Sequence, residues 1–210
     1  MGKDIILDAQ GKARCQEAAV FGRAYFRKYY FDAATRVTTP AEMRGRALLI
    51  AAVLRHAGMP VRSILDAGCG IGLMRKPFAE AIPRARYRGL ESSEYLCRRY
   101  GWLQGSVTEF SPRLPSDLLI CYDVLQYLDD RNASKAIANL ARMTRCALYM
   151  SALTREDWHR NCDRSRTDRA VHLRPGDWYR RRLRRRFEHI GFGVWLRKGV
   201  TAVLWDLERP

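Results

Sequence analysis

Short apolar runs alternate with amphipathic stretches along the central part of the chain. The apolar runs predict strands at residues 63–67, 87–90, 102–104, 118–122 and 147–153. Between them, the spacing of apolar positions predicts helices at residues 71–81, 94–100 and 133–143. Regular alternation of strands and helices indicates a parallel sheet with helices on both faces. The chain is therefore predicted to form a doubly wound α/β fold.

Two helices are expected ahead of this region. The first spans residues 15–31, where aromatic side chains recur at three- and four-residue spacing. The second begins at Pro40, because Thr39 offers a hydroxyl cap and Glu42 stands where a capping box needs it. It is expected to end near Gly58.

The C-terminal part predicts a helix at residues 178–190, followed by strands at 194–197 and 202–207. The Lys198-Gly199 turn between these two strands is too short for a crossover, so the pair must be antiparallel. With the five strands above, this gives a seven-stranded, mostly parallel sheet whose last strand is antiparallel.

We find no internal repeat or low-complexity linker in the 210 residues, which favours a single domain. Four regions are expected within it. They are an N-terminal helical cap (1–58), a binding core (59–153), a lid or substrate loop (154–178), and a closing helix with a strand pair (179–210). The region at residues 154–178 is long and polar, and such loops tend to cover binding sites.

Composition excludes several classes of protein. Apolar residues make up 47% and charged residues 29%, which is a globular composition and not that of a disordered chain. No apolar run approaches the roughly 18 residues of a membrane span, and we expect no signal peptide. The six cysteines are scattered without a C-x-x-C pair, so reduced thiols in the cytoplasm are expected.

The chain is strongly basic, with a net charge of +16, and +11 of this lies in residues 131–210. Such a field attracts nucleic acid, anionic lipid or acidic substrates. Six arginines, at 180–182 and 184–186, flank Leu183 on a predicted helix. They would surround that helix instead of forming one face, so a solvated arginine-rich surface is the simpler interpretation.

A glycine-rich turn, Asp66-Ala67-Gly68-Cys69-Gly70-Ile71-Gly72, follows the first core strand and opens a helix. Its G-x-G-x-G spacing differs from the dinucleotide fingerprint, and the Asp66 carboxylate would repel phosphate but attract an ammonium group. Glu91 ends the second strand, 23 residues beyond Gly68, where an acid accepts hydrogen bonds from ribose hydroxyls. These features predict a site for a nucleoside that carries a cationic amino-acid tail.

Three motifs, ILDAGCGIG, YRGLES and DLLICYDVLQYLDD, resemble those of class I S-adenosylmethionine-dependent methyltransferases, in the same order and over about residues 51–153. The resemblance implies a Rossmann-like fold and S-adenosyl-L-methionine as cofactor, with S-adenosyl-L-homocysteine as its product. It also implies that Asp66, Gly68, Gly70 and Gly72 pack against the methionine part and that Glu91 binds the ribose.

Other cofactor contacts follow from the same resemblance. An Asp often accepts from the adenine amino group after strand three of the family, and Ser106 stands there in this chain, with Val107 as an apolar neighbour. In related methyltransferases a helix ahead of the glycine loop folds over the cofactor and often presents a tyrosine; Tyr30 or Tyr29 is expected in this role, the alternative being an aromatic stripe that packs in the core. Cys121 at the end of strand four is expected beside the cofactor. Arg44 and Arg46 are candidates for the cofactor carboxylate, although solvated charges are the simpler interpretation.

The end of strand four bears on the methyl acceptor. CYDV lacks the Asn/Asp-Pro-Pro-aromatic turn that accompanies methylation of base amines, and Cys121 lacks the Pro-Cys setting of RNA cytosine enzymes. The run instead resembles the D-V-L-x-x-L of small-molecule methyltransferases. Asp123 is predicted either to orient a substrate amine or to cap the following turn.

A general base is sought in the polar loop. An imidazole in general changes charge near neutral pH, so His159 and His172 are candidates, the alternative being surface histidines without a role. A zinc site built on His159, Cys162 and His172 lacks a fourth ligand at a sensible spacing, so no metal site is expected.

The sequence therefore predicts a methyltransferase that acts on an oxygen or nitrogen of a small molecule, with an acidic acceptor favoured by the net charge. One alternative is an RNA or protein methyltransferase that uses the arginine-rich C-terminal region, although nucleic acid is not the favoured partner. Another is a cofactor-binding module without catalysis. No membrane partner is expected.

Overall fold

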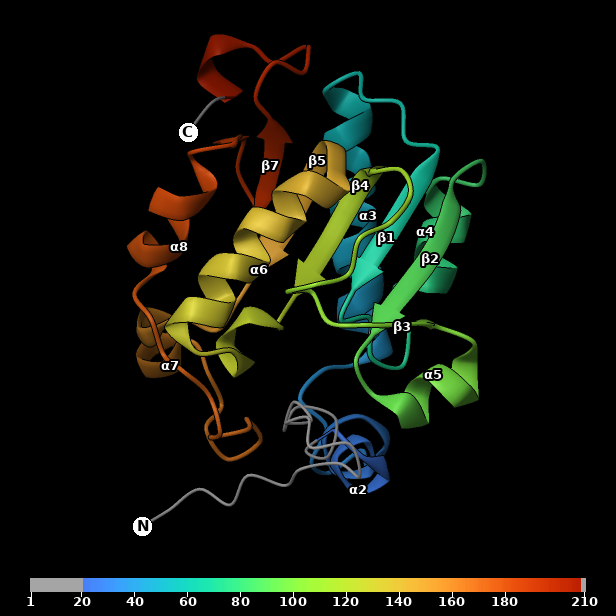
Figure 1. The fold of residues 1–210 in the computed structure, drawn as a ribbon, viewed down its shortest axis with the longest axis vertical. Coiled ribbons are helices and arrows are strands. Elements are labelled where there is room, and N and C mark those ends of the chain that lie inside the picture. Colours follow the sequence, from blue (N-terminus) through green and yellow to red (C-terminus); the bar gives the residue numbers. More distant parts are fainter. Residues whose placement is uncertain (1–20, 209–210) are drawn as a thin grey trace, which may run out of the picture.

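A seven-stranded sheet forms the centre of the computed structural model, which describes residues 21–208 (Figure 1). The strand order is β3-β2-β1-β4-β5-β7-β6. The strands are β1 (Ser63–Ala67), β2 (Arg86–Glu91), β3 (Leu103–Gln104), β4 (Ser116–Tyr122), β5 (Thr144–Ser151), β6 (Phe187–His189) and β7 (Val194–Arg197). The predicted α/β class and the seven-stranded sheet are confirmed.

Strands β1 to β5 are parallel, whereas β7 runs antiparallel to both of its neighbours, β5 and β6. The chain moves outward from β1 to β2 and β3, then returns to β4 on the other side of β1. Ligands of open α/β sheets bind at such a switch point, outside the carboxyl ends of the strands. The ends of β1 and β4 therefore mark where a site is expected.

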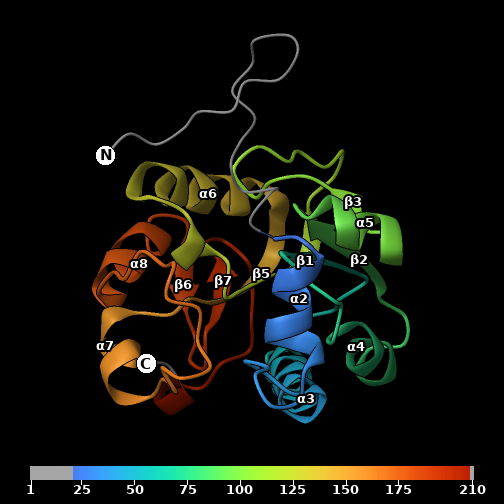
Figure 2. The ribbon, with the colours of Figure 1, turned by 90° about the horizontal axis from the view of Figure 1, so that it is seen from below.

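Helices cover both faces of the sheet (Figure 2). On one face lie α3 (Pro40–His56) and α4 (Arg75–Ala81), and on the other lie α6 (Asp130–Met143) and α8 (Gly176–Leu183). Neighbouring residues of a buried strand point to opposite faces, so Ile64 and Leu65 belong to different apolar clusters. Helix α5 (Glu94–Tyr100) packs against β2 and β3.

Local sequence signals set the helix boundaries before the sheet. The Thr39 hydroxyl accepts a hydrogen bond from the Glu42 amide at 3.2 Å, and the Glu42 carboxylate accepts from the Thr39 amide at 2.7 Å. This is the predicted capping box at the start of α3. Helix α4 begins at Arg75, later than predicted, because the glycine turn continues through Gly72; Pro77 lies in its first turn.

The C-terminal elements correct the sequence prediction for residues 179–210. The helix predicted at 178–190 ends at Leu183, and residues 187–189 form β6, which pairs with β7. The strand predicted at 202–207 is absent, and a 3-10 turn, Asp206–Glu208, lies there instead. Phe187 is fully buried, and positive φ angles at residues 191–193 produce the tight connection between β6 and β7.

Two other predicted regions differ in detail. The helix expected at residues 15–31 begins outside the described residues. Within them, the chain forms a short α-helix, α2 (Arg23–Phe26), followed by a π-helical turn, Arg27–Phe31. The polar loop at 154–178 contains a short helix, α7 (Arg155–Arg160), capped by Thr154. No helix within residues 21–208 has the length and apolar character needed to cross a bilayer.

Candidate active site

Two cavities adjoin the glycine turn at the carboxyl end of the sheet. Their volumes are about 590 Å³ and about 80 Å³. Five residues line both of them: Tyr30, Gly68, Gly70, Asp123 and Tyr127. The cavities are therefore two compartments of one site, and it lies at the predicted switch point of the sheet.

Gly68 and Gly70 bring the backbone close to both compartments. Gly68 has a φ of +79°, and a Cβ atom there would lie 2.3 Å from the Val124 side chain. Gly70 has a φ of +54° and lies against the Tyr30 ring, 3.8 Å from an added Cβ. Only glycine meets these demands without strain or collision, so the turn leaves room for a ligand beside its backbone.

Gly72 has a different role from the one expected, because it lines neither compartment of the described chain. An added Cβ would lie 2.4 Å from the Trp102 indole. That indole donates a hydrogen bond from Nε1 to the Gly70 carbonyl at 3.0 Å. Gly72 therefore makes space for Trp102, which braces the turn from behind, and sequence reasoning did not identify this tryptophan.

Gly72→Ala is expected to destabilise the chain, with Gly101→Ala as a matched control. Both glycines have positive φ, +75° and +70°, but nothing lies within 4 Å of a Cβ at Gly101. The control is expected to lose about 1 kcal/mol through backbone strain. Gly72→Ala is expected to lose a further 1–3 kcal/mol or so through the collision with Trp102. Denaturant unfolding measures both, and equal losses would contradict the bracing role.

Asp66 is the last but one residue of β1 and lines the larger compartment. Its carboxylate accepts a hydrogen bond from the Tyr87 hydroxyl. Burial raises the pKa of Asp66 to about 7, partly opposed by that hydrogen bond and reinforced by the charge of Glu91. The group is therefore poised to change charge near neutral pH.

Glu91 ends β2 and lines the smaller compartment. One carboxylate oxygen accepts from the Gly70 amide at 2.9 Å. The other accepts from the amides of Ser92 and Ser93, at 2.8 and 3.0 Å. The carboxylate thereby links the glycine turn to β2, and its remaining lone pairs can accept hydrogen bonds from further donors.

Ser106 and Val107, the residues expected beside the adenine, also line the smaller compartment. The Ser106 hydroxyl contacts the Thr108 hydroxyl at 2.8 Å. Cys121, by contrast, is fully buried in the apolar core and lines neither compartment of residues 21–208. The structure therefore does not bring Cys121 together with the other predicted cofactor residues.

Asp123 follows β4 and lies at the junction of the two compartments. Its φ is +54°, an uncommon value for a residue other than glycine, and such conformations cluster at functional sites. Burial raises the pKa of its carboxyl, while hydrogen bonding by Tyr122 and Gln126 acts in the opposite direction. Gln126, a residue that sequence reasoning did not single out, lines the larger compartment beside it.

Arg46 reaches the larger compartment from α3. Its guanidinium lies 4.4 Å over the Tyr122 ring and donates from Nη1 to the Tyr149 hydroxyl at 2.6 Å. Its Nε is buried and has no hydrogen-bond partner among the described residues. Arg44 instead pairs with Glu80 at the surface, so only one of the two arginines lines the site.

The two candidate histidines lie apart from these residues. His159 and His172 are both exposed, and neither lines a compartment of the described chain. The backbone amide of His172 donates to the Gln126 carbonyl at 2.7 Å, so its contact with the site is through the backbone. The placement offers no support for either imidazole as a general base.

The arginine run is partly engaged within the domain. Arg180 and Arg181 pair with Asp177, at 2.9 and 3.9 Å. Arg182 lies 3.5 Å over the Trp178 ring and donates to the Ser134 hydroxyl at 3.1 Å. These three arginines are therefore used in the packing and ion pairing of α8.

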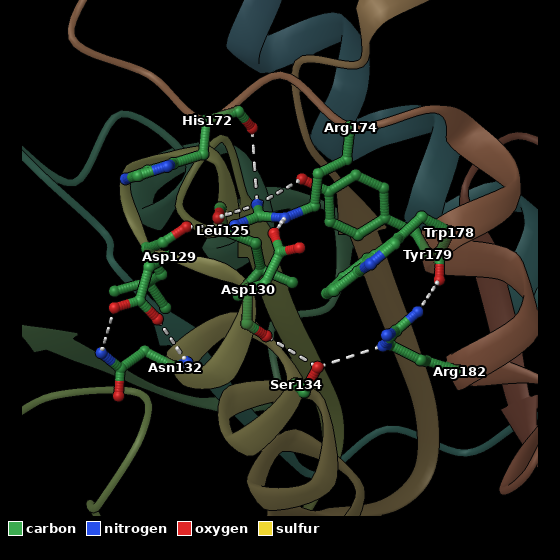
Figure 3. Close-up of polar contacts among 11 residues, drawn as sticks. Leu125, Asp129, Asp130, Asn132, Ser134, His172, Arg174, Trp178, Tyr179 and Arg182 are labelled. Carbon is green, nitrogen blue, oxygen red and sulfur yellow. Dashed lines mark hydrogen bonds and ion pairs between the residues drawn. The ribbon is translucent and has the colours of Figure 1, made fainter.

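Arg174 anchors the polar loop to the segment that follows β4, at residues 125–130 (Figure 3). It is only 3% exposed, and its Nε donates to Asp130 at 2.6 Å. Its Nη1 donates to the Leu125 carbonyl and the Tyr179 hydroxyl, both at 3.1 Å, and its Nη2 donates to the Leu128 carbonyl. The two carbonyls flank Gln126 and Tyr127, so Arg174 fixes the turn that presents both side chains to the cavity.

The sheet order and the glycine turn at its switch point define the fold of the class I S-adenosylmethionine-dependent methyltransferases, as the sequence motifs predicted. The magnesium protoporphyrin IX methyltransferase of Synechocystis PCC 6803, crystallised with bound SAH, has a TM-score of 0.60 at 19% identity, covering 87% of this chain and 98% of that one. The N-methyltransferase NodS of Bradyrhizobium japonicum WM9 gives 0.56 at 18% identity, over 82% and 95%.

A curated relative shares sequence with part of the chain. Trans-aconitate 2-methyltransferase of Azoarcus sp. (strain BH72) is 31% identical over 75 residues, which are 32% of this chain and 30% of that protein. The match thus spans under a third of the relative's length. No protein family model matches the chain.

Proposed function

We propose that this protein is an enzyme that transfers the methyl group of S-adenosylmethionine to a small-molecule acceptor. The observation that carries the proposal is the pair of compartments that meet at the glycine turn, with Glu91 in one and Asp66 in the other. The methyltransferase relative and the neighbours with bound SAH support it.

The residues present fit each part of the cofactor. Glu91 would accept hydrogen bonds from the ribose hydroxyls, with Ser106 and Val107 on the adenine side. In the larger compartment, Asp66 would attract the ammonium group of the methionine part. The unpartnered Nε of Arg46 would donate to its carboxylate, a charge-assisted hydrogen bond.

The aromatic N-terminal segment would cover the adenosine. Phe21, Tyr25 and Phe26 line the smaller compartment, and the Tyr25 and Tyr127 hydroxyls are 2.9 Å apart. The smaller compartment has a volume of about 80 Å³, well below the roughly 300–1,000 Å³ of sites for drug-sized ligands. These side chains would therefore move outward as the nucleoside binds and then cover it, which is the lid role proposed for this segment.

Catalysis would depend mainly on alignment and exclusion of water. When bound, S-adenosylmethionine supplies a methyl group activated by its sulfonium. The chain would place that group at the junction beside Asp123, with the acceptor in the larger compartment. Loop 154–178 contributes several residues to that compartment, and together with the aromatic segment it would restrict solvent access.

Two measurements test the proposal. Isothermal titration with S-adenosylmethionine and S-adenosylhomocysteine is expected to show binding of both. Tritiated methyl transfer into a desalted cell extract, with its small-molecule fraction returned, is expected to label the small fraction. Label that ribonuclease or protease destroys would favour a polymer substrate, and binding without any label would favour a non-catalytic module.

Cofactor affinity is expected to rise with pH through Asp66. Because its pKa is about 7, the carboxyl is mostly protonated at pH 6 and mostly ionised at pH 8. Only the ionised form attracts the positively charged cofactor, so affinity should increase about tenfold over this interval. Titrations at both pH values should show this rise, which Asp66→Asn should abolish and Glu94→Gln, at an exposed carboxylate, should retain. A rise that survives in Asp66→Asn would assign the titration to another group.

The same shift has a consequence for stability. The folded chain binds the Asp66 proton more tightly than the unfolded chain, so this residue lowers the free energy of unfolding as pH rises from about 4 to about 7. Asp66→Asn is therefore expected to be more stable than the parent at pH 8, while it binds the cofactor less well.

A further inference from the structure

The acceptor compartment differs in charge from the chain as a whole. Although the net charge is +16, the larger compartment is lined by six carboxyl groups and three guanidinium groups. The carboxyl groups belong to Glu42, Asp66, Asp123, Asp157, Asp163 and Asp168, and the guanidinium groups to Arg36, Arg46 and Arg166. The net charge favours an acidic acceptor. Without Asp66 and Arg46, which are assigned above to the cofactor, the compartment still has five carboxyl and two guanidinium groups, and these favour the opposite sign.

Two hydrogen-bond acceptors, the Asp123 carboxylate and the Gln126 side-chain carbonyl, belong to residues that line this compartment. Asp123 lies at the junction with the cofactor compartment, and Gln126 is three residues further along the chain. Gln126 is only 4% exposed, and its Oε1 has no hydrogen-bond partner within the described part of the chain. A buried acceptor without a donor costs about 1–3 kcal/mol, so a ligand that supplies a donor would gain that energy.

We propose that the acceptor substrate is an amine, held through its N–H groups by the Asp123 carboxylate and Gln126 Oε1, and that the methyl group is transferred to its nitrogen. This inference rests on the function proposed above. A neutral primary amine has two N–H donors and one lone pair, so it satisfies both acceptors and still presents the lone pair to the methyl group. A hydroxyl has one donor, and a carboxylate has none and would be repelled by Asp123.

The reaction balances on this assignment. The nitrogen lone pair forms the new N–C bond as the S–C bond to the methyl group breaks, and the electron pair of that bond remains on sulfur. The methylated nitrogen then carries the positive charge. It releases a proton to the Asp123 carboxylate, which passes the proton to solvent. The products are the neutral N-methylated acceptor and S-adenosylhomocysteine.

Binding to the full chain saturated with S-adenosylhomocysteine tests the assignment without turnover. The probes are shape-matched sets: benzylamine, benzyl alcohol and benzoate, and 2-phenylethylamine, 2-phenylethanol and phenylacetate. Dissociation constants are measured by ligand-observed NMR. The amines are expected to bind about tenfold more tightly than the alcohols or acids. Asp123→Asn should remove most of this preference, and Asn is chosen because it tolerates the positive φ. Glu109→Gln, at an exposed carboxylate, should leave it unchanged.

The outcomes separate this proposal from the one on which it rests. Amines that bind no better than the alcohols and acids, or not at all, would overturn the amine assignment. The proposed cofactor site would be unaffected by that result, because S-adenosylhomocysteine would still be bound. The same preference in Asp123→Asn as in the parent would overturn the role of Asp123. Failure of S-adenosylhomocysteine to bind would overturn the proposed function itself.

Discussion

Glu91→Ala is expected to weaken binding of S-adenosylmethionine and S-adenosylhomocysteine by about 100-fold or more. Each hydrogen bond to a charged group contributes about 1.5–3 kcal/mol, and the two ribose hydroxyls would donate two of them. Tenfold in affinity corresponds to about 1.4 kcal/mol, so two such bonds account for the loss. The uncharged adenine and the methionine tail would keep their own contacts, and residual binding is expected.

The variant also removes the contacts that Glu91 makes within the chain. The amides of Gly70, Ser92 and Ser93 lose their acceptor, so a modest decrease in stability accompanies the loss of affinity. Glu91→Gln separates the two effects, because its single carbonyl oxygen can still accept from one of these amides. We expect it to be folded and to bind the cofactor with intermediate affinity, as measured by titration calorimetry alongside circular dichroism.

An affinity for S-adenosylhomocysteine that is unchanged in Glu91→Ala would remove the smaller compartment as the ribose site. Loss of the folded circular dichroism spectrum in both variants would show that the carboxylate acts mainly on structure. The comparison with Glu91→Gln therefore decides between a ligand contact and a structural contact at this position.

The core of the fold follows from local sequence patterns. Strands β1 and β4 are buried on both faces, so they appear in the sequence as short continuous apolar runs. The capping box of Thr39 and Glu42 depends on neighbouring residues alone, and the glycine turn is marked by its own glycines with positive φ, although Glu91 and Trp102 also hold it. Each of these was predictable because the physical cause lies within a few residues of its effect.

Strand β6 was not predictable in the same way. Strand β6 has only three residues, and Glu188 and His189 give it no apolar pattern. It forms because β7 is there to pair with it and because Phe187 enters the core beneath it. The apolar positions of residues 202–207 resemble a strand, but Trp205 and Leu207 are exposed and no strand pairs with them among the described residues.

In the site, too, some positions follow from nearby residues and others depend on residues far away in the sequence. Asp66, Glu91 and Asp123 lie at or directly after the carboxyl end of a strand, so their position at the sheet edge follows from the strand itself. Arg46 takes its position from Tyr149, which is 103 residues away. The histidines of loop 154–178 were chosen for their chemistry, but the path of that loop decides where they lie, and it places them at the surface.

Arg174 determines much of that path, and its replacement is expected to have the largest effect on stability. Arg174→Ala leaves the Leu125 and Leu128 carbonyls without their donor and Asp130 without its ion pair. It also removes the guanidinium that lies 4.8 Å over the Trp178 ring. Asp130 is exposed and regains water, so the loss comes mainly from the two buried carbonyls. Each hydrogen bond to a charged group contributes about 1.5–3 kcal/mol, and two of them are a large part of the roughly 5–15 kcal/mol that stabilises a typical domain.

Because that loss approaches the stability of a whole domain, Arg174→Lys provides a milder change. Its single ammonium group can reach some of the same acceptors but lacks the planar fork that serves them together. Denaturant unfolding is expected to place it between the parent and the alanine variant. Arg164→Ala, at an exposed arginine of the same loop, should change the free energy of unfolding by less than about 0.5 kcal/mol.

The anchoring role also predicts an effect on binding that a purely structural arginine would not produce. If Arg174 fixes the turn that carries Gln126 and Tyr127, a folded Arg174→Lys chain should bind S-adenosylhomocysteine only slightly less well than the parent. Tyr127 lines both compartments, but Glu91 and the glycine turn are untouched. Its preference for amines over the matched alcohols and acids should fall, because Gln126 is no longer held in place. Retention of that preference in a destabilised Arg174→Lys chain would confine Arg174 to a role in stability.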